Sequence, residues 1–190
     1  MVNLTRIYTR TGDDGTTALG DMSRALKTDL RLEAFADVDE ANSSIGVAIA
    51  MGNLDQDVKD LLIRVQNDLF DVGADLATPV GKKNDMPQLR VLPGYVDELE
   101  KAIDHYNSFL QPLSSFILPG GTSGAVLLHV ARTVVRRAER STWTAFTAHK
   151  IVMTETPARY LNRLSDLLFV LARYSNREQG DVLWVPGANR

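Results

Sequence analysis

The fold of this chain is decided by the stretch FILPGGTSG, residues 116–124, and by AVLLHVARTVVRRAER, residues 125–140, which follows it. The Pro-Gly-Gly sequence interrupts regular structure, and Thr122 and Ser123 are residue types that begin helices. Nothing after them breaks a helix until Pro157. We therefore predict a long helix that begins near Thr122.

Two stripes run along this predicted helix. The first is apolar, with spacings of three and four that would face a core, and consists of Leu128, Ala131, Val135 and Ala138. The second is polar and consists of His129, Arg132, Arg136 and Glu139. Guanidinium groups beside a core bind phosphate or carboxylate well, because arginine stays charged and presents a planar fork of donors. A solvated charged face, with supporting pairs such as Arg136 and Glu139, explains the second stripe equally well.

Length and composition describe one soluble globular domain: 190 residues, of which 44% are hydrophobic and 24% charged. The formal net charge of -3 argues against a general nucleic-acid binder, so any anion site must be a local cluster of basic residues. The chain has no cysteine, which excludes disulfides, thiolate metal sites and cysteine nucleophiles.

Two further classes of protein are disfavoured. The histidines, His105, His129 and His149, are far apart and stand in no metal-binding pattern, so no protein-built zinc or di-iron centre is expected. Residues 1–10 lack the apolar run of a signal peptide, and no stretch approaches the length of a membrane span. We expect a cytoplasmic protein.

The N-terminal segment RTGDDGTTALG, residues 10–20, has no helical or strand period and is expected to form a loop. Its glycines let backbone N–H groups approach an anion and its threonines add donors, so phosphate binding is chemically reasonable. Asp13 and Asp14 would repel a triphosphate unless Arg10, Lys27 or a divalent cation such as Mg²⁺ offsets them. The residue order of a Walker A loop is missing, and a surface turn or hairpin is the alternative.

Four more helices are predicted from apolar residues at helical spacing, with Phe35 and Phe70 among those residues. Their expected ranges are 29–53, 55–76, 93–109 and 157–178, with Asp55 capping the second and Pro93 in the first turn of the third. Residues 78–92 are expected to form a loop, and residues 182–185 a short strand or packed tail. The pattern predicts an all-α, antiparallel five-helix bundle that is an oligomer.

Four stretches together resemble the PduO-type ATP:cob(I)alamin adenosyltransferases, also called corrinoid adenosyltransferases. They are IYTRTGDDGTT (7–17), DVDEANS (37–43) followed by Ile45-Gly46, the opening stretch (116–140), and YLNRLSDLLF (160–169). Each alone is moderate evidence, but their order and spacing cover almost the whole chain.

The resemblance implies a trimer of helical bundles with each active site between two subunits. It implies one domain over residues 1–190, with an ATP loop at 1–28, the bundle at 29–178 and a C-terminal tail at 179–190. The family transfers the 5′-deoxyadenosyl group of ATP to the cobalt of cob(I)alamin, giving adenosylcobalamin and triphosphate, with Mg²⁺ bound mainly through the ATP phosphates. The implied protein partners are a flavin-type reductase and an adenosylcobalamin-dependent enzyme, with neither nucleic acid nor membrane involved.

The resemblance also implies site residues, carried over by motif position. The ATP-binding residues are Thr9, Arg10, Thr11, Gly12, Asp13, Gly15, Thr16, Thr17, Lys27, Arg132, Arg136, Glu139 and Asn162. The corrinoid-binding residues are Phe116, Asp39 and Arg132, and these three carry the catalytic roles together with Arg136. Asp39 is implied to be the acidic partner of Arg132 across the subunit interface, and Phe116 to occupy the corrin face where the lower axial base would sit.

The implied chemistry suits these residue types, because a cobalt(I) nucleophile needs no serine, cysteine or general-base histidine. Two other functions compete with it. A non-catalytic helical module could bind nucleotide or corrinoid in the same pockets for cofactor delivery or sensing. A purely structural bundle would leave the N-terminal loop and the set of Arg132, Arg136 and Asn162 without a reason.

Overall fold

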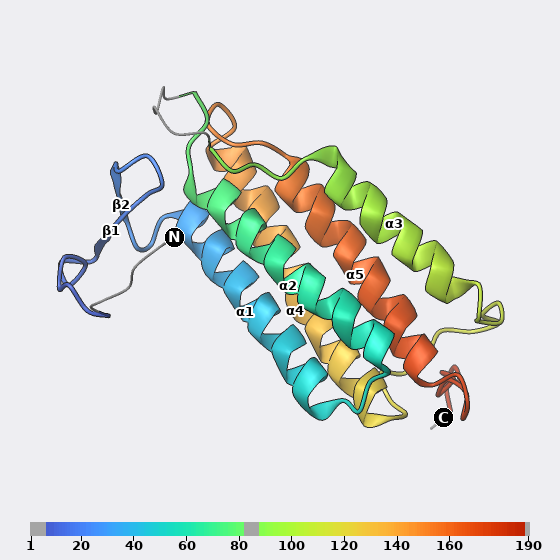
Figure 1. Ribbon diagram of the computed structural model, residues 1–190. Coiled ribbons are helices and arrows are strands. Elements are labelled where there is room, and N and C mark those ends of the chain that lie inside the picture. The colour runs from blue at the N-terminus through green and yellow to red at the C-terminus, as the bar shows by residue number, and fades with distance from the viewer. Residues whose placement is uncertain (1–6, 82–87, 189–190) are drawn as a thin grey trace.

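Five α-helices form most of the computed structural model, which describes residues 7–81 and 88–188 (Figure 1). They are α1 (Leu30–Met51), α2 (Gln56–Ala77), α3 (Pro93–Asn107), α4 (Ser123–Ala148) and α5 (Thr156–Ser175). The predicted five-helix bundle is confirmed, with helix ends within about three residues of those expected. The last helix stops short of residue 178 because the side chain of Asn176 bonds to the loop before α4 instead.

The sheet in the described residues is one antiparallel hairpin of β1 (Thr16–Ala18) and β2 (Arg24–Leu26), in which Thr16 pairs with Leu26 and Ala18 with Arg24. It lies beside the end of the bundle where α1 begins (Figure 1). The segment expected to be a loop therefore contains a hairpin, and the fold is mostly helical rather than purely so.

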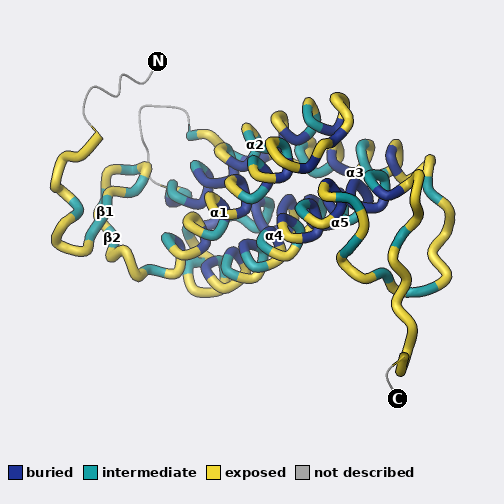
Figure 2. The backbone as a smooth tube through the Cα atoms, turned by 90° about the horizontal axis from the view of Figure 1, so that it is seen from below, coloured by how far each residue is buried: buried dark blue, intermediate teal, exposed yellow. Residues whose placement is uncertain are grey.

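The core lies between α1, α4 and α5, with α2 packed on α1 and α3 packed on α5. Figure 2 shows the buried residues as a continuous band along the facing sides of the helices. The apolar stripe predicted on α4 is confirmed, since Leu128, Ala131, Val135 and Ala138 are all fully buried. Burying such a stripe is what stabilises a bundle, because isolated helices of this length are marginal in water.

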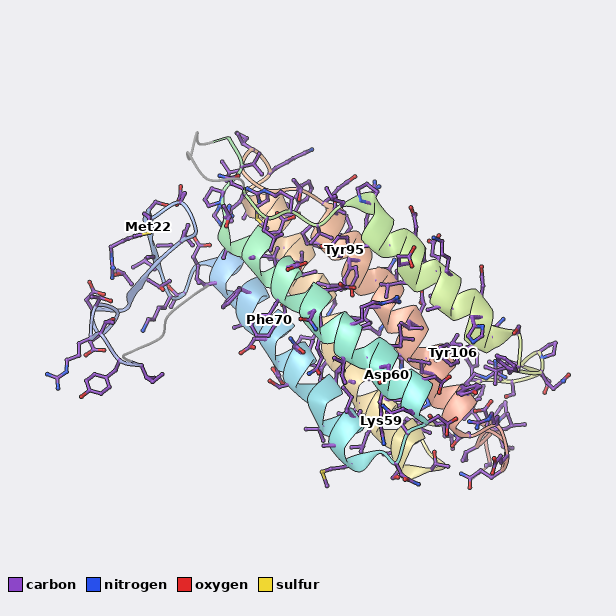
Figure 3. All side chains as sticks on the ribbon, in the orientation of Figure 1. Met22, Lys59, Asp60, Phe70, Tyr95 and Tyr106 are labelled. Atoms are coloured by element: carbon purple, nitrogen blue, oxygen red, sulfur yellow. The ribbon has the colours of Figure 1, made fainter. Side chains whose placement is uncertain are left out.

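Two of the apolar positions expected in the core lie on the surface. Phe35 on α1 is 40% exposed and packs over Gly73, and Phe70 on α2 is 73% exposed and points away from the bundle (Figure 3). The core is already filled by small and branched residues such as Val38 and Ile45. The helix pattern is correct, but α1 and α2 are apolar on a wider arc than one chain can bury.

The helix ends follow their capping residues. The hydroxyl of Thr122 accepts a hydrogen bond from the N–H of Ala125, as expected for the first residue before α4. Asp55 precedes α2 as predicted, but its carboxylate pairs with Arg177 at 2.8 Å and makes no capping bond. None of the helices in the described ranges is both long and apolar enough to cross a membrane.

Candidate functional site

A cleft of about 660 Å³ opens at the end of the bundle where α4 begins. It is lined by Leu113, Ser114, Ser115, Phe116, Ile117, Pro119, His129, Arg132, Phe169 and Trp184. The structure thus brings together two residues that the sequence assigned to the corrinoid side, Phe116 and Arg132. The cleft is mostly apolar with one cationic group, which is the usual character of a site for a large organic ligand.

The C-terminal tail builds one wall of this cleft. The N–H of Leu118 donates to the carbonyl of Val182 at 2.7 Å, and the N–H of Trp184 donates to the carbonyl of Phe116 at 2.8 Å. The rings of Phe116 and Trp184 meet edge to face, with centroids 5.9 Å apart, and Phe116 is 78% exposed. The tail expected at residues 182–185 therefore forms a single bridge of strand type that presents two aromatic rings.

The opposite wall comes from α4 and α5. His129 is 3% exposed and its ring lies 6.1 Å from that of Phe169, while neither of its ring nitrogens has a hydrogen-bond partner among the described residues. The Nε of Arg132 is likewise buried and unpartnered within the described chain. Burial, followed by the charge of Arg132, lowers the pKa of His129 and keeps the ring neutral.

Among the described residues, Arg132 forms no ion pair, and the charge closest to it in effect is the positive charge of Arg136. Its pKa is lowered first by burial and then by the positive charge of Arg136, one turn further along α4. Among the described residues, neither arginine forms an ion pair with Glu139, so the supporting pair of Arg136 and Glu139 that the alternative of a solvated face would contain is missing. Unbalanced guanidiniums beside an apolar cleft favour an anion-binding role over a merely solvated face.

Contacts between α4 and α5 fix which residues lie side by side on these antiparallel helices. The N–H of Thr122 donates to the Oδ1 of Asn176 at 2.9 Å, and His129 contacts Phe169. The second contact lies seven residues farther along each helix, which is two helical turns.

The same step of seven residues brings Arg136 level with Asn162. Both side chains are exposed, and they occupy positions two turns from the His129–Phe169 contact at the cleft. Arg136 and Asn162, two of the predicted ATP-binding residues, therefore lie at the same level along the bundle. They lie on the same face as the cleft, two helical turns beyond the His129–Phe169 contact.

The acidic motif of α1 divides into two faces. Asp37 and Glu40 point to α4 and form ion pairs with Arg137, the Asp37 pair at 3.4 Å. Asp39 is exposed and makes no ion pair with Arg132 within this chain. The pairing of Asp39 with Arg132 that the resemblance implies therefore stays a prediction.

The N-terminal loop is held by its own side chains. The Oδ1 of Asp14 accepts from the N–H and hydroxyl of Thr16 at 3.0 and 2.7 Å, and these bonds lower the pKa of Asp14. Arg24 pairs with Asp14 at 3.4 Å and donates to the carbonyl of Thr11 at 2.7 Å. The charge of Asp14 is therefore offset by Arg24, which the sequence reading did not consider, and not by Arg10 or Lys27.

Lys27 nevertheless belongs to the loop. Its N–H donates to the carbonyl of Gly15 at 2.9 Å, and a Cβ built on Gly12 would lie 3.3 Å from its Nζ. Of the remaining predicted loop residues, Thr9, Arg10, Thr11 and Asp13 are exposed, whereas Thr16 and Thr17 are half-buried in β1. Arg10 adopts φ 62° and Gly15 φ 80°, and the N–H of Gly15 donates to the carbonyl of Gly12 at 3.3 Å, so the segment is a tight turn.

Within one chain, the hairpin lies at one end of the bundle and the C-terminal tail at the other (Figures 1 and 2), and the cleft lining includes Trp184 of that tail. The residues that the sequence missed are Phe169 and Trp184 in the cleft and Arg24 in the loop. Phe169 stood inside a quoted motif, so its helical position beside His129 could have been found. Trp184 could not, because its place depends on backbone pairing with a distant loop.

Fold and cleft together have the features of a helical-bundle protein that takes a large, mostly apolar ligand beside a row of arginines. The model of the cobalamin adenosyltransferase family matches residues 7–175 of this chain. The chain therefore belongs to the cobalamin adenosyltransferase family, as the motifs indicated.

Individual relatives agree with this assignment. The corrinoid adenosyltransferase of Mycobacterium tuberculosis strain H37Rv is 59% identical over 189 residues, covering 100% of this chain and 97% of that protein. The corrinoid adenosyltransferase of Bacillus subtilis is 42% identical over 178 residues, covering 92% and 89%. A solved structure of a variant PduO-type ATP:corrinoid adenosyltransferase from Lactobacillus reuteri, complexed with cobalamin and ATP, matches with a TM-score of 0.85 and 37% identity, covering 94% of this chain and 99% of that one.

This chain is a corrinoid adenosyltransferase, an enzyme that carries out the ATP-dependent adenosylation of cobalamin. The family assignment confirms the activity inferred from the motifs and removes the case for a purely structural bundle or a non-catalytic module.

Proposed function

We propose that the enzyme works as a homotrimer in which each active site combines the N-terminal loop of one chain with the cleft and α4 of its neighbour. The single observation that carries this proposal is that the hairpin and the start of α4 lie at opposite ends of the bundle within one chain (Figure 1). On α4, Arg132 at the cleft lies 16 residues before Ala148, which is about 24 Å along the helix, and the loop lies beyond that end. One molecule of ATP is too short to bridge the loop and the cleft of a single chain.

The nucleotide side of the proposed site holds the triphosphate. Backbone N–H groups and hydroxyls of the loop, from Thr9 to Thr17, would bind phosphate oxygens together with the ammonium of Lys27. Arg136 and Asn162, level with each other on α4 and α5, would hold the rest of the nucleotide with Glu139. This division gives Lys27 and Arg136 an anion, which suits the lack of an ion pair to either of them among the described residues.

The corrinoid side of the proposed site is the aromatic cleft. Phe116 stands exposed at its mouth and would cover the corrin face where the lower axial base would sit. Arg132 would be oriented by Asp39 of a neighbouring subunit, since Asp39 is exposed and free of Arg132 in its own chain. An apolar ring that excludes the lower ligand would leave cobalt(II) four-coordinate and easier to reduce.

The reaction then follows from position and charge. The electron pair of cobalt(I) forms a bond to the 5′ carbon of ATP while the bond from that carbon to the phosphate oxygen breaks, and triphosphate departs with the electron pair of that bond. The chain contributes alignment of the carbon with cobalt and stabilisation of the negative charge that grows on the leaving triphosphate, by Arg136 and Lys27.

Mg²⁺ fits this site as an ion carried by the nucleotide. In the described residues, no cluster of three or more histidine, aspartate or glutamate side chains could hold a metal. The loop does offer oxygen donors of the kind that Mg²⁺ prefers, in Asp13 and the threonine hydroxyls. Held mainly through the ATP phosphates, the ion would supply further charge neutralisation on the triphosphate. Reduced corrinoid would come from a flavin-type reductase, and product would pass to an adenosylcobalamin-dependent enzyme.

The test compares two starting oxidation states of cobalamin. The wild-type enzyme mixed with MgATP and chemically reduced cob(I)alamin should give the spectrum of adenosylcobalamin with release of triphosphate. Phe116→Ala should lose much more activity when cobalt(II) must be reduced on the enzyme than when cobalt(I) is supplied. Phe109→Ala removes a comparable exposed ring that lies outside the cleft and should affect neither route. Equal losses by both routes in Phe116→Ala would reject the role given to that ring.

A further inference from the structure

The turn of the N-terminal hairpin caps the C-terminal end of α2. The last carbonyls of a helix have no partner inside the helix and must find one elsewhere. The carbonyl of Ala77 accepts from the N–H of Gly20 at 2.9 Å. Among the residues that the structure describes, no other backbone hydrogen bond joins residues 16–26 to a helix. The hairpin is thus attached to the bundle by way of a helix end.

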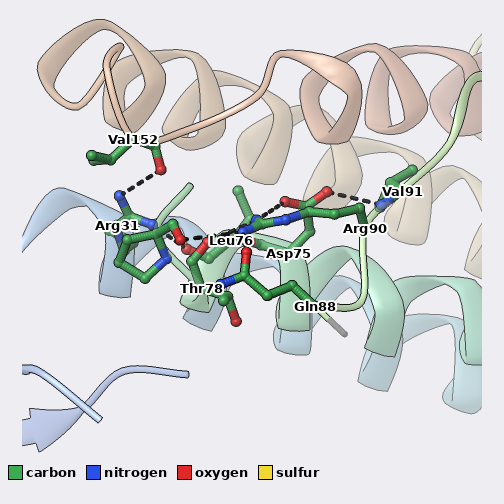
Figure 4. Close-up of polar contacts among 9 residues, drawn as sticks. Arg31, Asp75, Leu76, Thr78, Gln88, Arg90, Val91 and Val152 are labelled. Atoms are coloured by element: carbon green, nitrogen blue, oxygen red, sulfur yellow. Dashed lines mark hydrogen bonds and ion pairs between the residues drawn. The ribbon is translucent and has the colours of Figure 1, made fainter. Parts of the chain in front are cut away.

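Two arginines hold the rest of that helix end in place (Figure 4). Arg31, which is 3% exposed, donates to the carbonyl of Leu76 at 2.9 Å. Arg90 donates to the carbonyls of Asp75 and Thr78 at 3.1 and 2.7 Å and pairs with the Asp75 carboxylate at 2.6 Å. Positive groups at a helix C-terminus are favourable for the helix dipole as well. The end of α2 that contacts the hairpin, Ala77 with Thr78, is therefore held by buried and partly buried charge-assisted bonds.

Gly20 approaches this platform more closely than any other residue type could. A Cβ built on Gly20 would overlap the Oγ1 of Thr78 and lie 3.1 Å from its Cβ. The backbone of Gly20 is not in the left-handed region, so lack of space is the reason for glycine here. The next residue, Asp21, attracts the charge of Arg31, which adds an electrostatic contact at the same point.

Any displacement at Gly20 is transmitted to the phosphate-binding loop. Leu19 donates its N–H to the carbonyl of Ser23 at 2.7 Å, which closes the turn directly beside Gly20. The paired strands β1 and β2 begin directly after this turn, with Ala18 opposite Arg24. At their other end, the N–H of Lys27 donates to the carbonyl of Gly15. The hairpin therefore moves as one piece with the loop at residues 9–17.

We propose that Gly20 is a positioning residue for ATP: its contact with Ala77 and Thr78 sets where the loop stands relative to the bundle, and thereby the affinity for the triphosphate. The inference rests on the proposed role of the loop. Nucleotide binding would thus be controlled by a contact between Gly20 and the end of α2, although neither of these touches the substrate.

The experiment is steady-state kinetics with cob(I)alamin and MgATP on Gly20→Ala. We expect the KM for ATP to rise about 10-fold or more, because small misplacements of binding groups are costly. The KM for cob(I)alamin and the helix content should not change. Thr78→Gly removes the obstructing side chain, so the double variant should bind ATP within about twofold of Thr78→Gly alone. A KM for ATP that stays normal in Gly20→Ala, or is not restored in the double variant, overturns the proposal.

Three further variants separate the effect of the Gly20 contact from a general effect of alanine and from the role of the loop itself. Gly94→Ala makes the same change where a Cβ meets open space and should leave all constants unaltered. Asp21→Asn weakens the attraction to Arg31 and should raise the KM for ATP in the same direction, which keeps the test valid if Gly20→Ala does not fold. Lys27→Met tests the loop itself. If Lys27→Met has no effect on ATP, the proposed loop function fails; if only Lys27→Met has an effect, the inference about Gly20 alone fails.

Discussion

Two neighbouring arginines, Arg136 and Arg137, differ completely in their surroundings. Arg137 is bound by Glu40 and Asp37 of α1, whereas Arg136 is exposed and makes no ion pair among the described residues. We expect Arg136→Gln to lower kcat/KM for ATP about 100-fold, because a donor that stabilises the departing charge is removed. Its free energy of unfolding should change by less than about 0.5 kcal/mol, since the side chain is exposed and forms no ion pair with the residues that the structure describes.

Arg137→Gln is the matched control for this prediction. It removes the same charge one residue away but breaks the contact between α1 and α4, so stability should fall by about 0.5–1 kcal/mol while activity is largely kept. Kinetics and urea unfolding on both variants decide the matter. Loss of activity in Arg137→Gln with little loss in Arg136→Gln would mean that the roles are exchanged.

His129 makes stability depend on pH. Burial and the charge of Arg132 lower its pKa, while Asp181 in the tail acts in the opposite direction, and the facing ring of Phe169 is neutral. The unfolded chain therefore takes up a proton at a higher pH than the folded chain does. As the pH falls below about 6.5, the unfolded state is favoured, so the free energy of unfolding should decrease.

His129→Leu removes this dependence, and the measurement is urea unfolding of both proteins between pH 8 and pH 5. The wild type should lose more stability over this range than the variant. His105 and His149 are present in both proteins, so the difference between the two curves isolates His129. Parallel curves would show that the buried ring takes up its proton normally.

At the level of elements, α4 shows how much a sequence can predict. Its start at Thr122, its buried stripe and its polar stripe follow from local chemistry, because capping and periodicity depend on residues close in sequence. The wall of the cleft formed by the C-terminal tail could not be predicted in this way. It depends on contacts such as the hydrogen bond from the hydroxyl of Ser115 to the carbonyl of Trp184, which lies 69 residues away in the sequence. Backbone pairing of that kind leaves no periodic signal in so short a segment.

The loop before α4 depends on Gly121. This residue has φ 106°, and a Cβ on it would lie 2.6 Å from the Cγ of Asn176, whose side chain bonds to Gly120 and Thr122. Gly121→Ala should therefore lower the free energy of unfolding by about 2–4 kcal/mol, from backbone strain together with lost hydrogen bonds. It should also impair the cobalt(II) route, because the loop carries Phe116.

Gly180→Ala is the control for Gly121→Ala. Gly180 has φ 84° but open space around it, so the substitution introduces backbone strain without a clash and should cost only about 1 kcal/mol. Chemical denaturation measures both. Equal losses in the two variants would mean that the contact with Asn176 contributes nothing to the loop.

For the whole molecule, the exposed apolar residues and the divided site have one common explanation. Val47, Met51, Ile63 and Phe70 on α1 and α2 are all more than 40% exposed. Exposed apolar residues that gather on neighbouring helices are typical of surfaces that bind another chain. A trimer would cover such a surface and would also bring the loop of one chain to the cleft of the next. Light scattering should then give three times the chain mass of 21.0 kDa.

A mixed trimer tests the shared site directly. One chain carries Lys27→Met and lacks a working loop; the other carries Arg136→Gln and lacks a working α4 row. Each homotrimer should be nearly inactive. In trimers co-expressed in equal amounts, roughly a quarter of the sites would combine an intact loop with an intact neighbouring α4, so activity should return to that fraction of wild type. Sites contained within one chain would regain nothing, because every chain carries one of the two defects, and the absence of any gain would show that the loop and α4 of the same chain act together.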